Sequence, residues 1–325
     1  MHPAPGSESA GVHEARFRAM GSDAHVIMIG HDAALLDFSV SRIAALEQRW
    51  SRFIETSEIS HLNRHPGDDV AISPETRLLV ERAVEAWRLT GGSFDPTVLG
   101  DVIRAGYDRS FDELSGTLRP GSSMLGKGAT NIVIGATTVR LPEGVGFDPG
   151  GIGKGLAADL VASEAIEAGA DGICINLGGD LRVLGRPPAD EAWGVAIEHQ
   201  LVAEPVVLVV LAEGAVATST TLRRQWRVDG RARHHLIDPS TGQPSESDIS
   251  LVTVVGGEAW MAEVLAKAEL LRGSARVFEL VGGTGAEALA VTDDGRVLST
   301  HGMTRFVGPA GIPERVQLAH PEVDS

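Results

Sequence analysis

A glycine-rich stretch, GFDPGGIGKG at residues 146–155, places Asp148 and Lys154 on either side of several glycines. A carboxylate, exposed backbone N–H groups and an ammonium this close together can hold a polyphosphate or its metal ion. The stretch is not a P-loop, because Gly153-Lys154 is followed by Gly155 and not by the hydroxyl residue that binds magnesium. The third glycine also comes one residue too early for a dinucleotide fingerprint. A tight turn with a surface lysine is the competing interpretation.

Three other polar clusters lie beside apolar or glycine-rich segments. Ser93, Phe94 and Asp95 precede a proline, where an Asx-type turn would explain them as well. The sequence NLGGD at 176–180 is typical of a strand end that approaches a ligand closely, or of a bulge with a capping aspartate. The sequence HHLIDPSTG at 234–242 offers histidine, the usual general base near neutral pH, although DPSTG alone is ordinary turn chemistry.

The composition limits the classes of partner. The chain has 325 residues, of which 43% are hydrophobic, and a formal net charge of −16. An acidic surface repels nucleic acid and anionic lipid, so we expect no nucleic-acid partner and no direct membrane segment. The longest apolar run, at 206–212, is too short to span a bilayer, and the N-terminus lacks the regions of a signal peptide. We therefore expect a cytoplasmic protein, with its single cysteine, Cys174, as a buried thiol.

The elements that position these clusters mix strand-like and helix-like patterns without regular βαβ repeats. Strands are expected at 15–30, 193–199 and 205–219, a strand broken by Gly178-Gly179 at 172–185, two strands with a turn between them at 130–142, and a hairpin around Asp294-Gly295 at 288–300. Helices are expected at 33–53, 73–92, 156–169 and 257–274. This mixture favours an α+β fold with mixed or antiparallel sheets and packed helices over a doubly wound sheet. We expect one domain at 14–311 between flexible tails at 1–13 and 312–325.

The order of these motifs resembles the ApbE family of FAD:protein FMN transferases. The resemblance rests on FRAMGSDAHV, SRFIETSEISHLN, GGSFDPTV, FDPGGIGKGLAADLV, INLGGDLRVLG, AVATST and HHLIDPSTGQP, and runs from about Arg16 to about Gly308. It implies an ApbE-like fold with an FAD cleft and an enzyme that uses FAD and Mg²⁺. Such an enzyme splits the FAD diphosphate, attaches FMN through its phosphate to a threonine of an acceptor flavoprotein domain, and releases AMP.

The resemblance also implies roles for individual residues. His235 falls on the presumed catalytic base, while Gly151, through its carbonyl oxygen, and Glu263 fall on metal-ligand positions. The positions that would contact FAD are Met20, Phe53, Ser93, Phe94, Asp95, Asp148, Lys154 and Leu236. Threonine is a weak nucleophile, so a base must take its proton, and phosphoryl transfer otherwise depends on positioning and charge neutralisation.

One segment departs from the family pattern. The second metal segment usually reads Ala-Asp-Ala-x-Ala-Thr-Ala, whereas AEVLAKA at 262–268 has Glu263 in place of aspartate and Lys267 in place of threonine. The two side chains are four residues apart on a predicted helix and share a face. Lys267 either places its ammonium where part of the metal charge would lie or pairs with Glu263. We expect a magnesium requirement that persists in an altered form.

Two other functions stay open on this sequence. One is a magnesium-dependent FAD pyrophosphatase that yields FMN and AMP, in which water replaces the threonine. The other is a non-catalytic FAD-binding protein, which a lysine in place of the metal would favour. The basic strip RRQWRVDGRARHH at 223–235 is expected near the mouth of the FAD cleft, where it would meet an acidic acceptor loop or the nucleotide phosphates, or else form a solvated hairpin.

Overall fold

The computed structural model describes residues 10–109, 126–188, 192–228 and 231–319. Eight of the described strands form one central sheet, in the spatial order β1 (Gly11–Ala19), β2 (Ser22–Gly30), β6 (Gly172–Leu177), β7 (Asp180–Gly185), β10 (Gly214–Thr220), β15 (Ile249–Gly256), β16 (Glu287–Thr292) and β17 (Val297–Ser299). Every neighbouring pair in this sheet is antiparallel. The α+β fold with antiparallel sheets expected from the sequence is therefore confirmed.

Both faces of the central sheet are buried, because successive side chains of its strands enter two different hydrophobic cores. In β15, Val252 and Val254 belong to one core, whereas Leu251 and Val255 belong to the other. This alternation follows from the period of two in an extended strand. A strand buried on both faces reads as a nearly continuous apolar run, and the SLVTVV segment of β15 shows that pattern.

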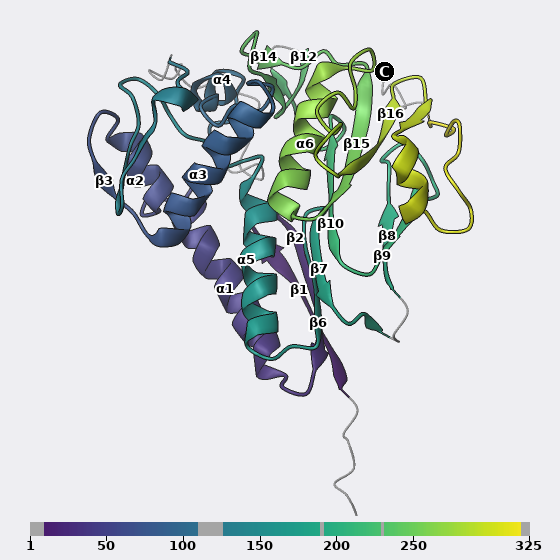
Figure 1. Ribbon diagram of the computed structural model, residues 1–325. Helices are drawn as coiled ribbons and strands as arrows, with labels where there is room; N and C mark the ends of the chain where they lie inside the picture. The colour runs from purple at the N-terminus through teal and green to yellow at the C-terminus, as the bar shows by residue number, and fades with distance from the viewer. Residues whose placement is uncertain (1–9, 110–125, 189–191, 229–230, 320–325) are drawn as a thin grey trace, which may run out of the picture.

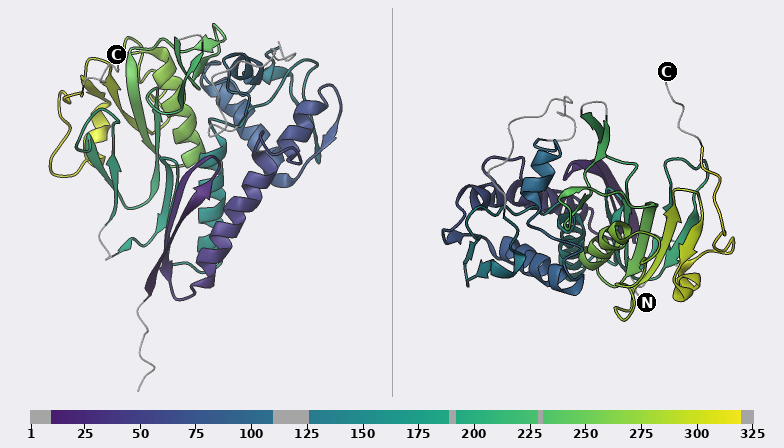
Figure 2. Two further views of the ribbon diagram at one scale, coloured as in Figure 1. Left: turned by 180° about the vertical axis from the view of Figure 1, so that it is seen from behind. Right: turned by 90° about the horizontal axis from the view of Figure 1, so that it is seen from above.

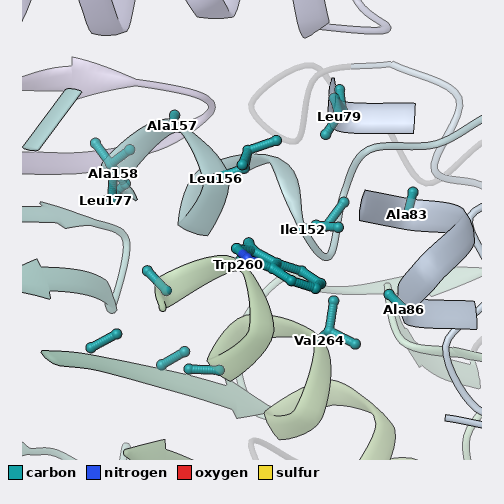
Figure 3. Packing of buried hydrophobic residues seen from close by; sticks show 14 of the residues in the cluster. Leu79, Ala83, Ala86, Ile152, Leu156, Ala157, Ala158, Leu177, Trp260 and Val264 are labelled. Carbon is teal, nitrogen blue, oxygen red and sulfur yellow. The ribbon is translucent and has the colours of Figure 1, made fainter. Parts of the chain in front are cut away.

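Three helices cover one face of the sheet, as Figure 1 shows: α1 (Ala34–Trp50), α5 (Gly153–Glu167) and α6 (Ala259–Arg272). The indole of Trp260 lies at the centre of this core, beside Ile152 and Leu156 of the α5 region and Val264 of its own helix (Figure 3). The opposite face is covered by a hairpin of β8 (Trp193–Ile197) and β9 (Val207–Leu211), which contributes to the second core. The sheet is thus the middle layer of three.

The remaining helices, α2 (Glu58–Arg64), α3 (Pro74–Leu89) and α4 (Leu99–Arg104), form a lobe beside α1. Figure 2 shows this lobe, seen from above, on the side away from β16. Small sheets complete the fold. One has the spatial order β3 (Val70–Ala71), β5 (Thr138–Arg140) and β4 (Val133–Ile134). Strands β11 (Gln225–Val228) and β12 (Arg231–His234) form another, as do β13 (Ile237–Asp238) and β14 (Gln243–Pro244). The structure confirms Ser73 as the N-cap of α3, because its hydroxyl accepts a hydrogen bond from the N–H of Thr76 at 3.3 Å.

The segment 205–219, expected as one strand, contains β9 and β10, which belong to different sheets. The segment 15–30, also expected as one strand, is a hairpin, and so is 172–185, which was expected to break at Gly178-Gly179. The chain reverses at Met20-Gly21 between β1 and β2, and at Gly178-Gly179 between β6 and β7. Met20 has a φ of 50°, in the left-handed region that few residues other than glycine adopt, so the sequence pattern gave no sign of a turn there. Both turns lie at the same end of the central sheet, and the functional candidates gather around them.

The tails differ in part from expectation. Strand β1 begins at Gly11, so residues 11–13 belong to the sheet, and the N–H of Ala319 donates to the carbonyl of Leu201 at 2.7 Å. Residues 1–9 and 320–325 of the expected tails lie outside the described residues. Within the described residues, no helix combines the length and the apolar character needed to cross a membrane.

Candidate active site

A cavity of about 980 Å³ lies at the end of the central sheet where the two hairpin turns meet the start of α5. Its wall is assembled from segments that are far apart in the sequence: the turn at 20–23, the end of α1, the glycine-rich stretch 148–154, the turn at 178–181, the segment 216–224, the segment 235–237 and one face of α6. The cavity has the size of a cofactor site rather than of a packing defect.

The glycine-rich stretch forms a sharp turn that leads directly into α5. The carboxylate of Asp148 accepts a hydrogen bond from the N–H of Gly150 at 2.9 Å, and the guanidinium of Arg52 lies 3.7 Å from the same oxygen. Helix α5 begins at Gly153 and has no side-chain N-cap. The N–H groups of Gly153 and Gly155 donate to Pro149 and Glu263, so the positive end of the helix dipole is what favours a negatively charged ligand at this end of the cavity.

Lys154 lies between two carboxylates, one from the β6–β7 turn and one from α6. Its ammonium forms an ion pair with Asp180, and it lies 3.1 Å from Oε1 of Glu263. Burial lowers the pKa of Lys154, while Glu263 opposes that shift and Arg224 adds to it. The second oxygen of Glu263 accepts the N–H of Gly155 at 2.8 Å, so both oxygens of this carboxylate have protein partners.

Lys267 enters the cavity wall one turn further along α6. Its ammonium donates to the carbonyl oxygen of Gly150 at 3.1 Å and lies 5.9 Å from the ring centroid of Phe94. Burial lowers the pKa of Lys267, although Asp148 and Glu263 act in the opposite direction. Within the part of the chain that the structure describes, no carboxylate lies within 4.0 Å of this ammonium. The pairing of Lys267 with Glu263 considered from the sequence is therefore absent.

His235 lies in the cavity wall between His234, at the end of β12, and buried Leu236. Burial lowers the pKa of His235 well below its ordinary value of 6.5, and the neighbouring cations Arg224 and Lys267 lower it further. Its Nδ1 is buried and has no hydrogen-bond partner. The lowered pKa favours the neutral imidazole, which carries a proton on one nitrogen only and can accept one at the other.

An aromatic group forms another part of the wall. The guanidinium of Arg52 lies 4.1 Å from the ring centroid of Phe53 and 4.8 Å from that of Tyr107. Tyr107 stacks in turn on Trp226, with ring centroids 5.6 Å apart. Phe53 is 41% exposed, a large apolar face for a ligand ring to cover.

The turn at Met20 is held from two sides. Half-buried Glu47 of α1 accepts hydrogen bonds from the N–H groups of Met20 and Gly21, and its partial burial raises its pKa. From the other side, the guanidinium of Arg224 donates to the carbonyl of Gly21 at 3.1 Å and to the hydroxyl of Ser22 at 2.9 Å. These contacts keep the Met20 side chain in the cavity wall despite its positive φ.

Most residues expected at the site from the sequence do line the cavity: Met20, Phe53, Asp148, Gly151, Lys154, His235, Leu236, Glu263 and Lys267. Three do not. Asp95 accepts hydrogen bonds from the N–H and hydroxyl of Thr97, which is the Asx turn weighed against a ligand role. The hydroxyl of Ser93 accepts from Arg272 at 3.3 Å. Phe94 is buried and supports Gly151 and Lys267 from beneath.

Several lining residues were not singled out from the sequence. Arg52 and Glu47 look like surface positions of an amphipathic helix, and nothing in their spacing indicates an inward direction. Asp180 and Arg224 were included in broader candidate segments, 176–180 and 223–235, but without individual roles. Side chains at 227–232 in that basic strip lie outside the described residues.

The magnesium site expected at Gly151 and Glu263 does not fit these residues. The ammonium of Lys154 and the N–H of Gly155 contact the two oxygens of Glu263. The ammonium of Lys267 donates a hydrogen bond to the neighbouring carbonyl of Gly150. Magnesium prefers several oxygen ligands in octahedral geometry, and a positively charged ammonium cannot supply one. Across the described ranges, no cluster of three or more His, Cys, Asp or Glu side chains could hold a metal ion.

The close approach of α5 and α6 sets the distance between Lys154 and Glu263. A Cβ added at Gly155 would lie 2.4 Å from the carbonyl oxygen of Ala259. We therefore expect Gly155→Ala to lower the free energy of unfolding by about 1–3 kcal/mol, the usual cost of overpacking. Urea denaturation would measure the loss. Gly153→Ala is the matched control, because its Cβ would meet nothing closer than 3.6 Å; equal stability of the two variants would contradict the expectation.

Comparison with known proteins places these features in a family. The sequence model of the ApbE family matches residues 20–290. Proteins named FAD:protein FMN transferase are 27% identical in Vibrio cholerae, over 81% of this chain and 82% of that protein, and 28% identical in Treponema pallidum, over 81% and 76%. The crystal structure of the ApbE protein from Thermotoga maritima superposes with a TM-score of 0.82 at 26% identity, covering 91% of this chain and 99% of that one. Because the family match spans most of the sequence and includes every segment of the cavity wall, the chain belongs to the ApbE family.

Proposed function

We propose that the protein is an FAD:protein FMN transferase, which moves FMN from FAD to a threonine hydroxyl of an acceptor flavoprotein and releases AMP. The observation that carries this proposal is the convergence of His235, Lys154 and Lys267 on one cavity of about 980 Å³. A neutral base and half-buried lysine side chains in one site suit the transfer of a phosphoryl group to an alcohol. The names of the relatives from Vibrio cholerae and Treponema pallidum support the same activity.

The proposed step forms one bond and breaks one bond. The threonine oxygen attacks the phosphorus of the FMN half, forming a P–O bond. The bond from this phosphorus to the bridging oxygen of the diphosphate breaks, and the electron pair leaves with that oxygen as AMP. The threonine proton passes to the neutral imidazole of His235, whose lowered pKa keeps it in the basic form at neutral pH.

The positions of the other groups support roles for them in this step. The positive end of the α5 dipole and the ammonium of Lys267 would neutralise the diphosphate oxygens as charge develops on them, whereas Lys154 stays paired with Asp180 and Glu263 in the cavity wall. Asp148 would act by shaping the glycine turn through its hydrogen bond with Gly150. Met20 and Phe53 would cover the apolar rings of the nucleotide.

Acceptor recognition is proposed to involve the basic segment beside His235. Arg223 is exposed, Arg224 is half-buried, and both reach the cavity wall. In a chain with a net charge of −16, such a patch would attract an acidic loop that carries the acceptor threonine.

Incubation with FAD and candidate threonine-bearing flavoprotein domains tests the proposal. The expected result is in-gel flavin fluorescence on the acceptor, a mass increase equal to FMN, and stoichiometric AMP. Replacing the acceptor threonine with valine should remove the label. Release of AMP without labelling would identify a pyrophosphatase instead, and bound FAD without AMP would identify a binding protein.

A further inference from the structure

The stability of the fold does not explain why residue 267 is a lysine. Its side chain is half-buried, and no carboxylate of the described residues lies within 4.0 Å of its ammonium. Partial burial of a charge without a counter-ion costs free energy, so packing alone gives no reason for a lysine here. The other buried cations of the site differ, because Lys154 pairs with Asp180 and Arg52 lies 3.7 Å from Asp148.

The geometry around Lys267 fixes its ammonium at the glycine turn. A Cβ on Gly151 would lie 2.8 Å from its Nζ and 2.9 Å from its Cδ, so a side chain at this position would displace Lys267 from the turn. Phe94 supports the same contact from below, and the carbonyl of Gly150 accepts its hydrogen bond. The chain contains only three lysines, and two of them line this cavity.

We infer that Lys267 is a built-in cation that replaces a divalent metal, so that the protein binds FAD and cleaves its diphosphate without magnesium. This inference rests on the proposed function. It differs from the altered but persistent magnesium requirement expected from the sequence.

The charges around the cavity support this inference. Each phosphate of a diphosphate diester carries about one negative charge, as a phosphodiester does in DNA. Lys267 and Arg224 are both in the wall and both lack a carboxylate partner in the described part of the chain, so each offers a positive charge to such a ligand. Lys154 offers none, because the carboxylates of Asp180 and Glu263 already outweigh its single charge. A divalent ion added beside Lys267 would be repelled by its ammonium.

Binding of FAD to the metal-free protein tests the inference directly. Quenching of flavin fluorescence would give Kd in EDTA and in excess magnesium for the wild type, Lys267→Met and Lys267→Thr. Methionine keeps most of the length without the charge, whereas threonine supplies a hydroxyl that magnesium can use. Lys127→Met is the matched control, since Lys127 also donates to a backbone carbonyl, that of Pro239, but lies outside the cavity wall.

We expect the wild-type Kd to be the same within about twofold in EDTA and in magnesium. Lys267→Met should bind FAD at least about tenfold more weakly in both, by loss of one charge-assisted contact, and AMP release should fall by about 10²-fold. Lys267→Thr should become magnesium-dependent, and Lys127→Met should behave as wild type.

The outcomes separate this inference from the function on which it rests. FAD binding by the wild type that requires magnesium, or unchanged binding by Lys267→Met, would overturn the inference even if FMN transfer were observed. Tight metal-free FAD binding that is lost in Lys267→Met, with neither AMP release nor labelling, would overturn the proposed transferase and the cleavage part of the inference, and would leave a lysine-dependent FAD-binding site.

Discussion

Replacing His235 with alanine is expected to lower the rate of FMN transfer by about 10²–10⁴-fold, the usual contribution of a positioned general base. FAD binding should change little, because the imidazole is neutral and the charged groups of the cavity wall stay in place. Single-turnover labelling with saturating FAD would measure the rate, and flavin fluorescence would measure the affinity. His301→Ala, an exposed histidine outside the cavity wall, is the control and should retain full activity.

The pH dependence of the wild type gives an independent check on the same residue. Burial and neighbouring cations hold the pKa of His235 well below 6.5, so the imidazole is already the base at neutral pH. Lowering the pH through 6.5 should therefore leave kcat/KM for FAD nearly constant, and the rate should fall only at clearly more acidic pH. A decline centred near 6.5 would contradict the burial of this base, and unchanged transfer by His235→Ala would exclude it as the base.

Removing the charge of Lys154 should have the largest effect on stability. Lys154→Met leaves Asp180 and Glu263, whose side chains are 3% and 5% exposed, without their shared cation. Breaking a buried ion pair in this way costs about 3–5 kcal/mol. Urea denaturation at neutral pH would measure the loss in the free energy of unfolding.

A second variant separates the lost ion pair from lost packing. Lys154→Met combined with Asp180→Asn removes one of the two orphaned charges, so it should be more stable than Lys154→Met alone. If the double variant were less stable than the single one, the ion pair would not be the source of the loss. Lys127→Met, in which an exposed cation is removed, should lose less than about 1 kcal/mol.

The sequence was sufficient for elements whose identity depends on local pattern. Helix α3 begins at Pro74 after the Ser73 N-cap and ends before Gly91-Gly92, as its capping residues predict. Buried Cys174 is also as expected, with burial raising its pKa to about 12. The hairpin at Met20 could not be predicted, because its positive φ is imposed by Glu47 and Arg224 from distant segments.

The site residues could be predicted where they occur in a recognisable motif. They were harder to predict where tertiary contacts determine which side chains meet. The glycine turn, Lys154 and His235 were expected at one site, and the structure places them around one cavity. Asp180 forms its ion pair with Lys154, which is distant in the sequence. No local sequence pattern predicts this partner. The sequence left open whether Lys267 pairs with Glu263 or places its ammonium at the metal position. The answer depended on where the carbonyl of Gly150 lies relative to α6.

The cavity wall joins segments that are nearly 250 positions apart in the chain, from Met20 to Lys267. A nucleotide bound in this cavity would therefore contact the helical layer, the sheet and the lobe at once, and would hold them together noncovalently. Bound at one hundred times its Kd, it would add about 2.7 kcal/mol to the free energy of unfolding. Resistance of the purified protein to heat or proteolysis should thus track the supply of FAD, so that nucleotide-starved molecules are the first to be degraded.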